Sequence, residues 1–270
     1  MTMPVAVREV APWVAQLARI GYVAKAILYA TVGILAAKAA LGRGGRTTDT
    51  SGALREVVHA PLGGALLFLV AAGLAGYAVW RLVDAITDAE GKGGDAKGIA
   101  RRVGSAVRGL AHGALAIGAF KLATGSGDGG GGGRTPELLS RGVEIAGGAW
   151  LLWLPAAGVI AYACYQLYRA YKAKLGSQLD LGAASAAAGH WVIGLSRFGI
   201  AARGVVFGLV GVLLVRAALH ENPQEAGGIR DSLQMLGEMG RWPLVAVAVG
   251  LVAYAVYELL NARYRRIRVA

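Results

Sequence analysis

The stretch Arg19-Ile-Gly-Tyr-Val-Ala-Lys25 opens an apolar run, and its pattern Arg-x-Gly-x3-Lys/Arg occurs three times in the chain of 270 residues. The other two copies occupy 102–108 and 197–203. A further basic residue follows nineteen positions after the first arginine of each copy; these residues are Lys38, Lys121 and Arg216. Self-similarity at a fixed spacing is the sequence signature of a repeat architecture. The chain is therefore predicted to consist of three copies of one unit.

Each copy also contains a second apolar run with a signature of its own, Gly-x3-Tyr-Ala-x-Trp/Tyr-x-Leu. The signature begins at Gly73, Gly158 and Gly250. Its aromatic positions are Tyr77, Trp80, Tyr162, Tyr165, Tyr254 and Tyr257. Two distinct signatures per copy predict a unit of two helices. Because two spans restore the direction of the chain, the three units are predicted to be parallel repeats.

The composition is that of a membrane protein. Hydrophobic residues make up 56% of the chain and charged residues 16%, against about 25% charged in soluble domains. Six apolar runs have the length of about 20 residues that a helix needs to cross a bilayer core. They are 20–41, 62–83, 103–124, 143–168, 198–219 and 243–260. The predicted fold class is an all-α membrane protein whose six transmembrane helices form three parallel-repeat helical hairpins around a pseudo-threefold axis.

The repeats and the charge distribution predict the organisation and the orientation of the chain. We expect an N-terminal cytoplasmic or interfacial segment, three two-helix repeats and a basic tail, at 1–18, 19–88, 101–175, 194–263 and 264–270. Fourteen Lys and Arg residues flank the runs on the side of the N-terminus and seven flank them on the other side. Because basic flanks favour the cytoplasm, both termini are predicted to be cytoplasmic, in a multi-pass protein of the inner membrane.

One face of the first helix in each unit carries only small residues. At about 100° per residue, the positions seven, eleven and fourteen after the first arginine share a helix face. These positions hold Ala26, Ala30, Gly33, Gly109, Gly113, Ala116, Gly204, Gly208 and Gly211. Small residues at such spacings let membrane helices approach closely. We therefore predict a helix-packing seam.

The basic residues within the apolar runs have two interpretations. Twelve uncharged residues separate the two cations of each first helix, about 18 Å, so long side chains can snorkel to the two interfaces without any further function. The alternative places Lys25, Arg108 and Arg203 at one depth, in grooves between the hairpins, where they bind anionic headgroups. The candidate site for an anionic lipid or another anion comprises Lys25, Arg108, Arg203, Arg19, Arg102 and Arg197.

Other side chains are predicted to have structural roles. His112 occupies the position that Tyr29 and Phe207 hold in the other units, which predicts a slot for a ring. The aromatic residues of the second signature are typical of an interfacial belt or of packing. Glu258 or Asp84 is expected to pair with a basic residue of a neighbouring helix.

Several features bound the chemistry. Pro155 lies within the fourth run and is expected to kink it. The histidines share no metal-ligand spacing, the single Cys164 lies in an apolar run, and we find no catalytic motif. We therefore expect no cofactor, no metal site and no enzymatic activity. The formal net charge of +12 lies beside apolar runs, which favours anionic lipid over nucleic acid as the partner.

The two signatures, together with Gly-x-Leu-Arg-Glu between the first two helices, resemble the bacterial integral membrane family labelled domain of unknown function 1206. The resemblance spans about 17–266 and implies three two-helix units, without implying any activity. The middle unit departs most, since it lacks the Leu-Arg-Glu element and contains the glycine run 129–133. The favoured function is a non-enzymatic scaffold or anionic-lipid-binding module; the alternative is a small channel or transporter. The sequence is also compatible with a homo-oligomer or with a membrane protein as the partner.

Overall fold

The computed structural model describes residues 12–89, 91, 93–127, 135–146, 148–172 and 186–264, and within these ranges every regular element is a helix. Six helices are long and apolar enough to cross a membrane, as a multi-pass membrane protein requires. They are α1 (Pro12–Ala40), α3 (Gly63–Thr87), α4 (Ala96–Ala123), α6 (Trp153–Lys172), α8 (Ala186–Leu219) and α10 (Arg241–Tyr264).

Short helices connect the two long helices of each unit. They are α2 (Thr50–Val58), α5 (Thr135–Ala146), the 3-10 helices η1 (Ala149–Leu152) and η2 (Pro223–Glu225), and α9 (Ile229–Met239). The carboxylate of Asp49 caps α2 by accepting from the N–H of Gly52 at 2.7 Å. Asp231, in the first turn of α9, accepts from the N–H of Gly228 at 2.7 Å. These carboxylates satisfy donors that the start of a helix leaves without an intrahelical partner.

The six predicted spans are all helical, but the fourth differs at its start. Residues 143–146 belong to α5, the chain continues through Gly148 and η1, and α6 begins only at Trp153. Pro155 therefore lies in the first turn of α6, where a missing N–H costs no hydrogen bond, and the expected mid-helix kink is wrong. Residues 12–18 form part of α1; the rest of the predicted N-terminal segment, and the tail beyond Tyr264, lie outside the described residues.

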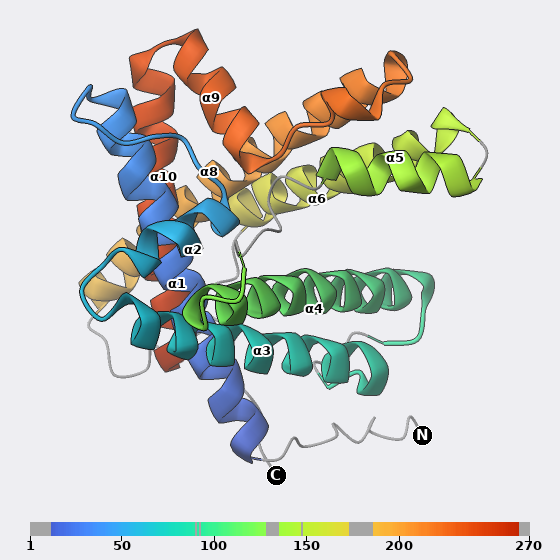
Figure 1. Ribbon diagram of the computed structural model, residues 1–270. Helices are drawn as coiled ribbons and strands as arrows, with labels where there is room; N and C mark the ends of the chain where they lie inside the picture. Colours follow the sequence, from blue (N-terminus) through green and yellow to red (C-terminus); the bar gives the residue numbers. More distant parts are fainter. Residues whose placement is uncertain are drawn as a thin grey trace, which may run out of the picture.

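The six long helices pack in the order α4–α3–α1–α10–α8–α6, which we call the helix arc. Figure 1 shows three close pairs, α3 with α4, α1 with α10, and α6 with α8. Each pair joins the second helix of one unit to the first helix of another. Within the first and third units, α1 also packs on α3 and α8 on α10. Among the described residues, α4 and α6 of the second unit form no such pair, so the arc is open between them.

Glycines explain the close crossings in the first and third units. Gly21 of α1 faces Gly73 and Tyr77 of α3, and a Cβ at Gly73 would lie 2.9 Å from the carbonyl oxygen of Ile20. In the third unit, a Cβ at Gly199 would overlap the backbone of α10, and one at Gly250 would overlap Ala202. The two signatures of the repeat therefore supply the two glycines at which the helices of one unit cross.

The second unit retains both glycines without the crossing. Gly104 is the counterpart of Gly21 and Gly199, and Gly158 is the counterpart of Gly73 and Gly250. A Cβ added at either would meet no atom within 4 Å among the described residues. Only 28% of the most apolar window of α4 and 22% of that of α6 are buried, against at least 50% for the other four helices. Among the described residues, the two long helices of the second unit therefore lack the close crossing that the other two units have.

The small-residue seam lies between units. Gly109 of α4 approaches Leu82 of α3, where a Cβ would lie 2.9 Å from Leu82 Cγ, and Gly204 of α8 approaches Leu167 of α6 in the same way. On α1, a Cβ at Gly33 would lie 2.8 Å from the carbonyl oxygen of Ala248 in α10. The remaining positions are buried or partly buried: Ala26, Ala30, Gly113, Ala116, Gly208 and Gly211. In each case the first helix of a unit packs along the second helix of another.

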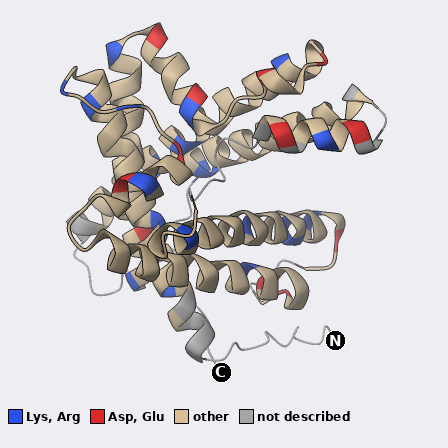
Figure 2. Cartoon of the chain, viewed as in Figure 1, with Lys and Arg blue, Asp and Glu red and all other residues tan. Residues whose placement is uncertain are grey.

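The apolar core lies on the side of α2 and α9. Leu28 of α1, Leu54 of α2, Leu74 of α3, Leu233 of α9 and Leu251 of α10 belong to one buried cluster. Figure 2 shows most of each long helix without charge; basic and acidic residues lie at helix ends, in the short helices and where the long helices converge. This convergence of charge on the inner side of the arc positions the candidate site.

The glycine crossings lead to a matched pair of predictions. We expect Gly250→Ala to lower the melting temperature of the detergent-solubilised protein, because its methyl group would overlap Ala202 and overpacking costs about 1–3 kcal/mol. The equivalent Gly158→Ala meets no neighbour and gains about 1 kcal/mol of helix propensity, so its melting temperature should not fall. Equal losses in the two variants would contradict the open crossing in the second unit.

Candidate functional site

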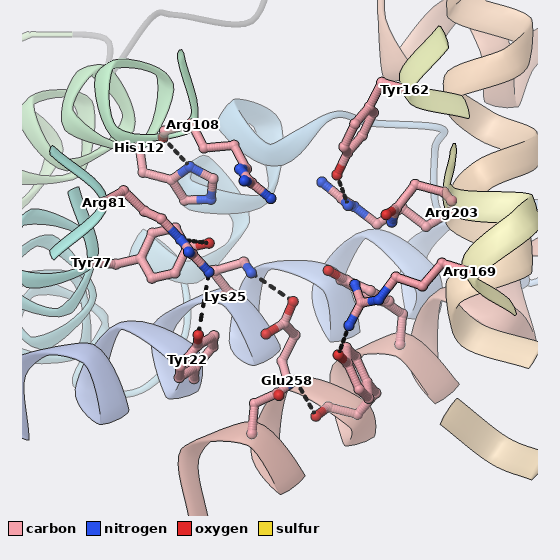
Figure 3. Close-up of a pocket in the computed structure, with 14 residues that line it drawn as sticks. Tyr22, Lys25, Tyr77, Arg81, Arg108, His112, Tyr162, Arg169, Arg203 and Glu258 are labelled. Carbon is pink, nitrogen blue, oxygen red and sulfur yellow. Dashed lines mark hydrogen bonds and ion pairs between the residues drawn. The ribbon is translucent and has the colours of Figure 1, made fainter. Parts of the chain in front are cut away.

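A cavity of about 40 Å³ lies on the inner side of the helix arc and is lined by residues from all six long helices. Figure 3 shows the lining side chains converging on it. The lining residues are Tyr22, Lys25, Tyr77, Arg81, Arg108, His112, Tyr162, Gln166, Arg169, Arg203, Tyr254, Tyr257, Glu258 and Asn261. We call this the central cavity. A water molecule needs about 10–15 Å³ on this measure, so the cavity has room for a small polar group.

One ion pair at the cavity joins the first and third units. Lys25 Nζ of α1 donates to Glu258 Oε1 of α10 at 2.6 Å, and both side chains are buried. The ammonium group also lies 4.7 Å from the centre of the Tyr77 ring. The expectation that Glu258 pairs with a neighbouring helix is confirmed. A buried charge of either sign is costly without its partner, so this pair fixes α1 against α10.

Arg81 of α3 is also neutralised. It lies 3.7 Å from Asp84 on the same helix, and the side chains of both residues are buried. It donates to the hydroxyl groups of Tyr77 at 3.0 Å and of Tyr22 at 3.4 Å. The ion pair that the structure describes for Asp84 therefore lies within its own helix. Arg81 and Lys25 together provide two cations with two carboxylate partners.

Arg203 of α8 has aromatic partners instead. Its guanidinium donates to the hydroxyl groups of Tyr29, at 2.8 Å, and of Tyr162. It also lies over the Tyr254 and Phe207 rings, 5.0 and 4.8 Å from their centres. The contact of a cation with a ring face contributes about 0.5–2 kcal/mol. The charge of Arg203 is thus stabilised by neutral groups, and among the described residues no carboxylate pairs with it.

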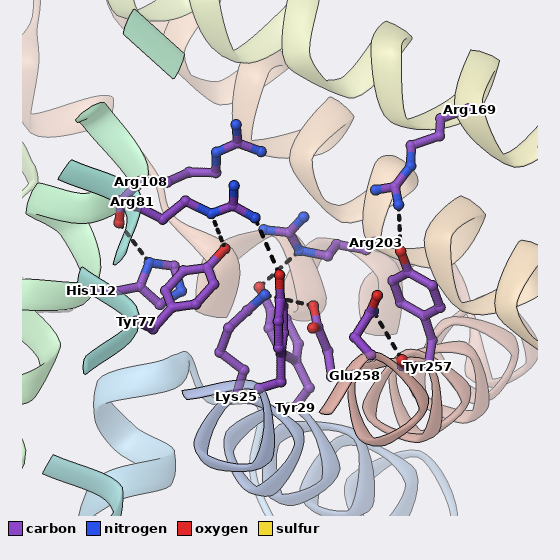
Figure 4. Close-up of polar contacts among 12 residues, drawn as sticks. Lys25, Tyr29, Tyr77, Arg81, Arg108, His112, Arg169, Arg203, Tyr257 and Glu258 are labelled. Atoms are coloured by element: carbon purple, nitrogen blue, oxygen red, sulfur yellow. Dashed lines mark hydrogen bonds and ion pairs between the residues drawn. The ribbon is translucent and has the colours of Figure 1, made fainter. Parts of the chain in front are cut away.

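Arg108 of α4 is the second cation whose described contacts include no carboxylate. Its guanidinium donates to the carbonyl oxygen of Gly104 at 2.9 Å and to Ser105 Oγ at 3.2 Å, both on its own helix. Figure 4 shows the Arg108 and Arg203 guanidinium groups on the same side of the Lys25–Glu258 pair. Gln166 of α6, which is 2% exposed, lines the same cavity. Its Nε2 has no hydrogen-bond partner in the part of the chain that the structure describes.

Charge is unevenly distributed around the central cavity. Among the described residues, five basic side chains line it, and the carboxylates beside them are those of Glu258 and the adjacent Asp84. The carboxylates belong to the third and first units, and neither belongs to the second. The described side chains at the cavity therefore carry more positive than negative formal charge. The excess lies on the side of α4, α6 and α8, which contribute Arg108, Arg169 and Arg203.

Three ring contacts around the cavity join the same helix pairs that pack between units. The expected slot for His112 exists, since His112 packs on Tyr77 with ring centres 4.7 Å apart. In the same way Tyr29 packs on Tyr254 at 4.7 Å, and Phe207 packs on Tyr162 at 5.2 Å. Each contact joins the first helix of a unit to the signature tyrosine of another unit. Tyr29, Tyr77 and Tyr254 are buried, and the rings of His112, Tyr162 and Phe207 are half-buried.

The six predicted anion ligands divide into two groups. Lys25, Arg108 and Arg203 lie at one shared cavity, so the expectation that they face separate grooves between hairpins is wrong; seam spacing alone did not indicate which side of the seam faced inwards. Snorkelling does not explain Lys25 and Arg203, which are 5% and 7% exposed, whereas Lys38, Lys121 and Arg216 are exposed. The second group does not line the cavity and consists of Arg19, Arg102 and Arg197. Arg102 instead donates to two carbonyl oxygens at the end of α3, each at 2.8 Å.

The signature aromatics also have different environments. Tyr77, Trp80, Tyr254 and Tyr257 are buried. The hydroxyl group of Tyr257 accepts from Arg169, and that of Tyr162, which is half-buried, accepts from Arg203. Tyr165 is the exposed exception, at 49%.

Of the polar residues that follow the signature tyrosines, sequence reasoning singled out Glu258 and Asp84 as pairing residues but did not place the set at one site. The positions four and seven after each tyrosine hold Arg81 and Asp84, Gln166 and Arg169, and Glu258 and Asn261. All are polar within apolar helices, at the spacing that puts residues on one helix face. That regularity was available in the sequence. Its convergence with the cations of the first helices was not, because it depends on how the units pack.

A second cavity lies among the connecting helices. It has about 510 Å³ and is lined by residues of α2, α9 and the segment around η2, with Pro136 of α5. Glu225 at its edge is held by His220 at 2.7 Å, and this hydrogen bond keeps the pKa of Glu225 below its ordinary value. Three basic and three acidic residues, which are Arg46, Arg55, Arg230, Asp49, Glu225 and Asp231, balance formally. Unlike the central cavity, this one has equal numbers of basic and acidic side chains among its described lining residues. Within the described ranges, no group of three His, Cys, Asp or Glu side chains could hold a metal ion.

Comparison with known proteins agrees with the three-unit organisation. The sequence model of the family described as Domain of Unknown Function (DUF1206) matches residues 20–88, 103–173 and 198–265. The chain is 30% identical over 262 residues to a Bacillus subtilis (strain 168) protein described as Uncharacterized protein YxxB. The aligned region covers 96% of this chain and 94% of that protein. No solved structure matches the chain.

The Lys25–Glu258 pair allows a test of the site. We expect Glu258→Gln to lower the free energy of unfolding by about 3–5 kcal/mol, because it leaves a buried ammonium group without a carboxylate. The double variant Lys25→Met with Glu258→Gln should recover most of that loss. As a control, Arg46→Gln removes the exposed pair with Glu56 at 2.8 Å, which should cost at most about 1 kcal/mol. Thermal unfolding in one detergent measures all three, and equal losses for the two single variants would rule out a role for the buried pair.

Proposed function

This chain belongs to the DUF1206 family, whose function is unknown, and from its central cavity we propose that it is a non-enzymatic membrane protein that binds an anion. The ligand group is an oxyanion such as a phosphate, either free or as the headgroup of an anionic lipid. Arg108 and Arg203 supply the charge and Gln166 supplies a neutral donor. The excess of positive charge in a cavity lined by all three units is the observation that supports this proposal.

The energetic argument begins with the cost of burying cations. An arginine removed from water is stable only when other groups replace its hydration. Tyr29 and Tyr162 do this in part for Arg203, and Gly104 and Ser105 do it in part for Arg108. A guanidinium carries five N–H donors, so both arginines retain donors beyond these bonds. An anion between them would accept from both and would lower the mutual repulsion of the two charges.

Geometry also favours an oxyanion. Guanidinium groups present planar pairs of donors that match carboxylate and phosphate oxygens. The Nε2 group of Gln166 offers two more N–H donors at the same cavity and has no partner among the described residues. A buried donor without an acceptor costs about 1–3 kcal/mol, and a bound oxyanion would remove that cost.

The proposal extends to topology. We propose that the three units are related by a pseudo-threefold axis through the central cavity, with both termini in the cytoplasm and the chain in the inner membrane. The order of inter-unit pairs supports the axis, since each unit's second helix packs on the first helix of the next. The greater number of Lys and Arg residues that flank the spans on the side of the N-terminus supports the orientation. Lys25, Arg108 and Arg203 would then be three equivalent positions of one site.

Phosphate binding tests the proposal. We expect sodium phosphate, added to the detergent-solubilised chain at constant ionic strength, to raise its melting temperature with saturation, since a ligand of the folded state stabilises it. Arg108→Gln should weaken the affinity at least tenfold, because a hydrogen bond to a charged group contributes about 1.5–3 kcal/mol. Arg108 suits this test because its described bonds are confined to its own helix turn and to Ser105.

Lys121→Gln provides the matched control. It removes the same charge from the same helix at an exposed position, and its phosphate affinity should equal that of the unmodified chain. The anion site would be disproved by equal phosphate affinities in the Arg108→Gln and Lys121→Gln variants, provided that Arg108→Gln also leaves the retention of acidic phospholipid unchanged.

A further inference from the structure

We infer that the ligand of the central cavity is a phospholipid with an exposed phosphate, and that it reaches the cavity sideways, between α4 and α6. This inference rests on the proposed anion site and specifies its ligand and its route. The phosphate would lie between Arg108 and Arg203, and an acyl chain would extend outwards between the two helices of the second unit. We call the gap between these helices the α4–α6 opening.

The first argument is the unused crossing. Gly104 and Gly158 occupy the positions at which α1 crosses α3 and α8 crosses α10. In those units the glycines are covered by the partner helix, whereas in the second unit no described atom lies within 4 Å of an added Cβ at either glycine. The opening is therefore the place where the arc would close if the second unit packed like the others. Neither glycine is covered by a helix among the described residues.

The second argument is the exposure of the residues that line the cavity. All lining residues on α1, α3, α8 and α10 are buried. The half-buried ones are confined to α4 and α6, and they are Arg108, His112, Tyr162 and Arg169. The cavity is thus reached from the side of the second unit. A soluble anion that approached along the middle of the arc would instead have to pass the lining residues on α1, α3, α8 and α10, which are buried.

The third argument is the chemistry of the walls. Val107, next to Arg108 on α4, is 59% exposed, and Leu154 and Tyr165 of α6 are 61% and 49% exposed. In a membrane such side chains contact acyl chains. A ligand that fits both the walls and the cavity needs an anionic end and a hydrocarbon end, which is the chemistry of an acidic phospholipid. A protein helix would fill the apolar part but would bring no phosphate to Arg108 and Arg203.

The experiment uses the full chain in nanodiscs of phosphatidylcholine with a small fraction of phosphatidic acid that carries a photoreactive group in its acyl chain. We expect cross-links on α4 near Val107 and on α6 near Leu154 and Tyr165, with at least fivefold lower yield for phosphatidylcholine carrying the same group. Arg108→Gln should lower the yield for phosphatidic acid to that of phosphatidylcholine, whereas Lys121→Gln should not change it.

A blocking variant separates this inference from the proposed function. Gly158→Trp places a large ring in the opening, and Gly194→Trp places the same ring on α8; at both positions no described atom lies within 4 Å of an added Cβ. We expect Gly158→Trp to reduce cross-linking at least fivefold while phosphate still raises its melting temperature, and Gly194→Trp to change neither.

Three results would overturn the inference. Unchanged cross-linking in Gly158→Trp would exclude the lateral route, although phosphate binding would leave the proposed function intact. Cross-links between two copies across α4 and α6, in place of lipid cross-links, would assign the opening to a second copy of the chain. If phosphate does not raise the melting temperature of the unmodified chain and phosphatidic acid does not cross-link to it, both the proposed function and this inference are wrong.

Discussion

The burial of cations at the centre of the helix arc is the constraint on which the rest of the structure depends. Lys25 of α1 is held by Glu258 of α10, and Arg203 of α8 is held by rings and hydroxyl groups from the same two helices and from α6. None of these side chains can be buried unless the others are in place, because an uncompensated charge in a membrane interior is costly. The polar layer therefore specifies which helix packs on which, while the glycine seams determine how closely they approach.

Much of the fold follows from the sequence alone. The spans could be located because each apolar run has the length that a bilayer imposes, and the three units could be aligned because two signatures recur at fixed offsets. The start of α6 was misplaced because residues 143–146 are helical and apolar enough to extend the run, and the break at Gly148 carries no proline or charge. Local composition could not separate α5 from α6.

The candidate site was only partly predictable. The equivalence of Lys25, Arg108 and Arg203 was visible in the repeat. That they line one cavity was not visible, because this depends on how α1, α4 and α8 pack against helices that are distant in the sequence. Glu258 was recognised as a pairing residue because a carboxylate in a span needs a partner. Gln166 was not singled out as a ligand, since a lone amide in an apolar helix gives no signal until its surroundings are known. The open second unit could not be predicted at all, because its glycines are the same as those of the closed units.

The different side chains at equivalent positions explain why three units share one polypeptide. The position four after the signature tyrosine is Arg81 in the first unit, Gln166 in the second and Glu258 in the third. A trimer of identical single-unit chains would place three copies of one of these residues around the axis, so its interior would hold three arginines, three amides or three carboxylates. Three units in one polypeptide can differ in sequence. The first and third units can therefore supply carboxylates, while the second unit supplies none and leaves its two long helices apart. A symmetric trimer of identical units would lack both the uneven charge and the single unit whose two long helices do not cross.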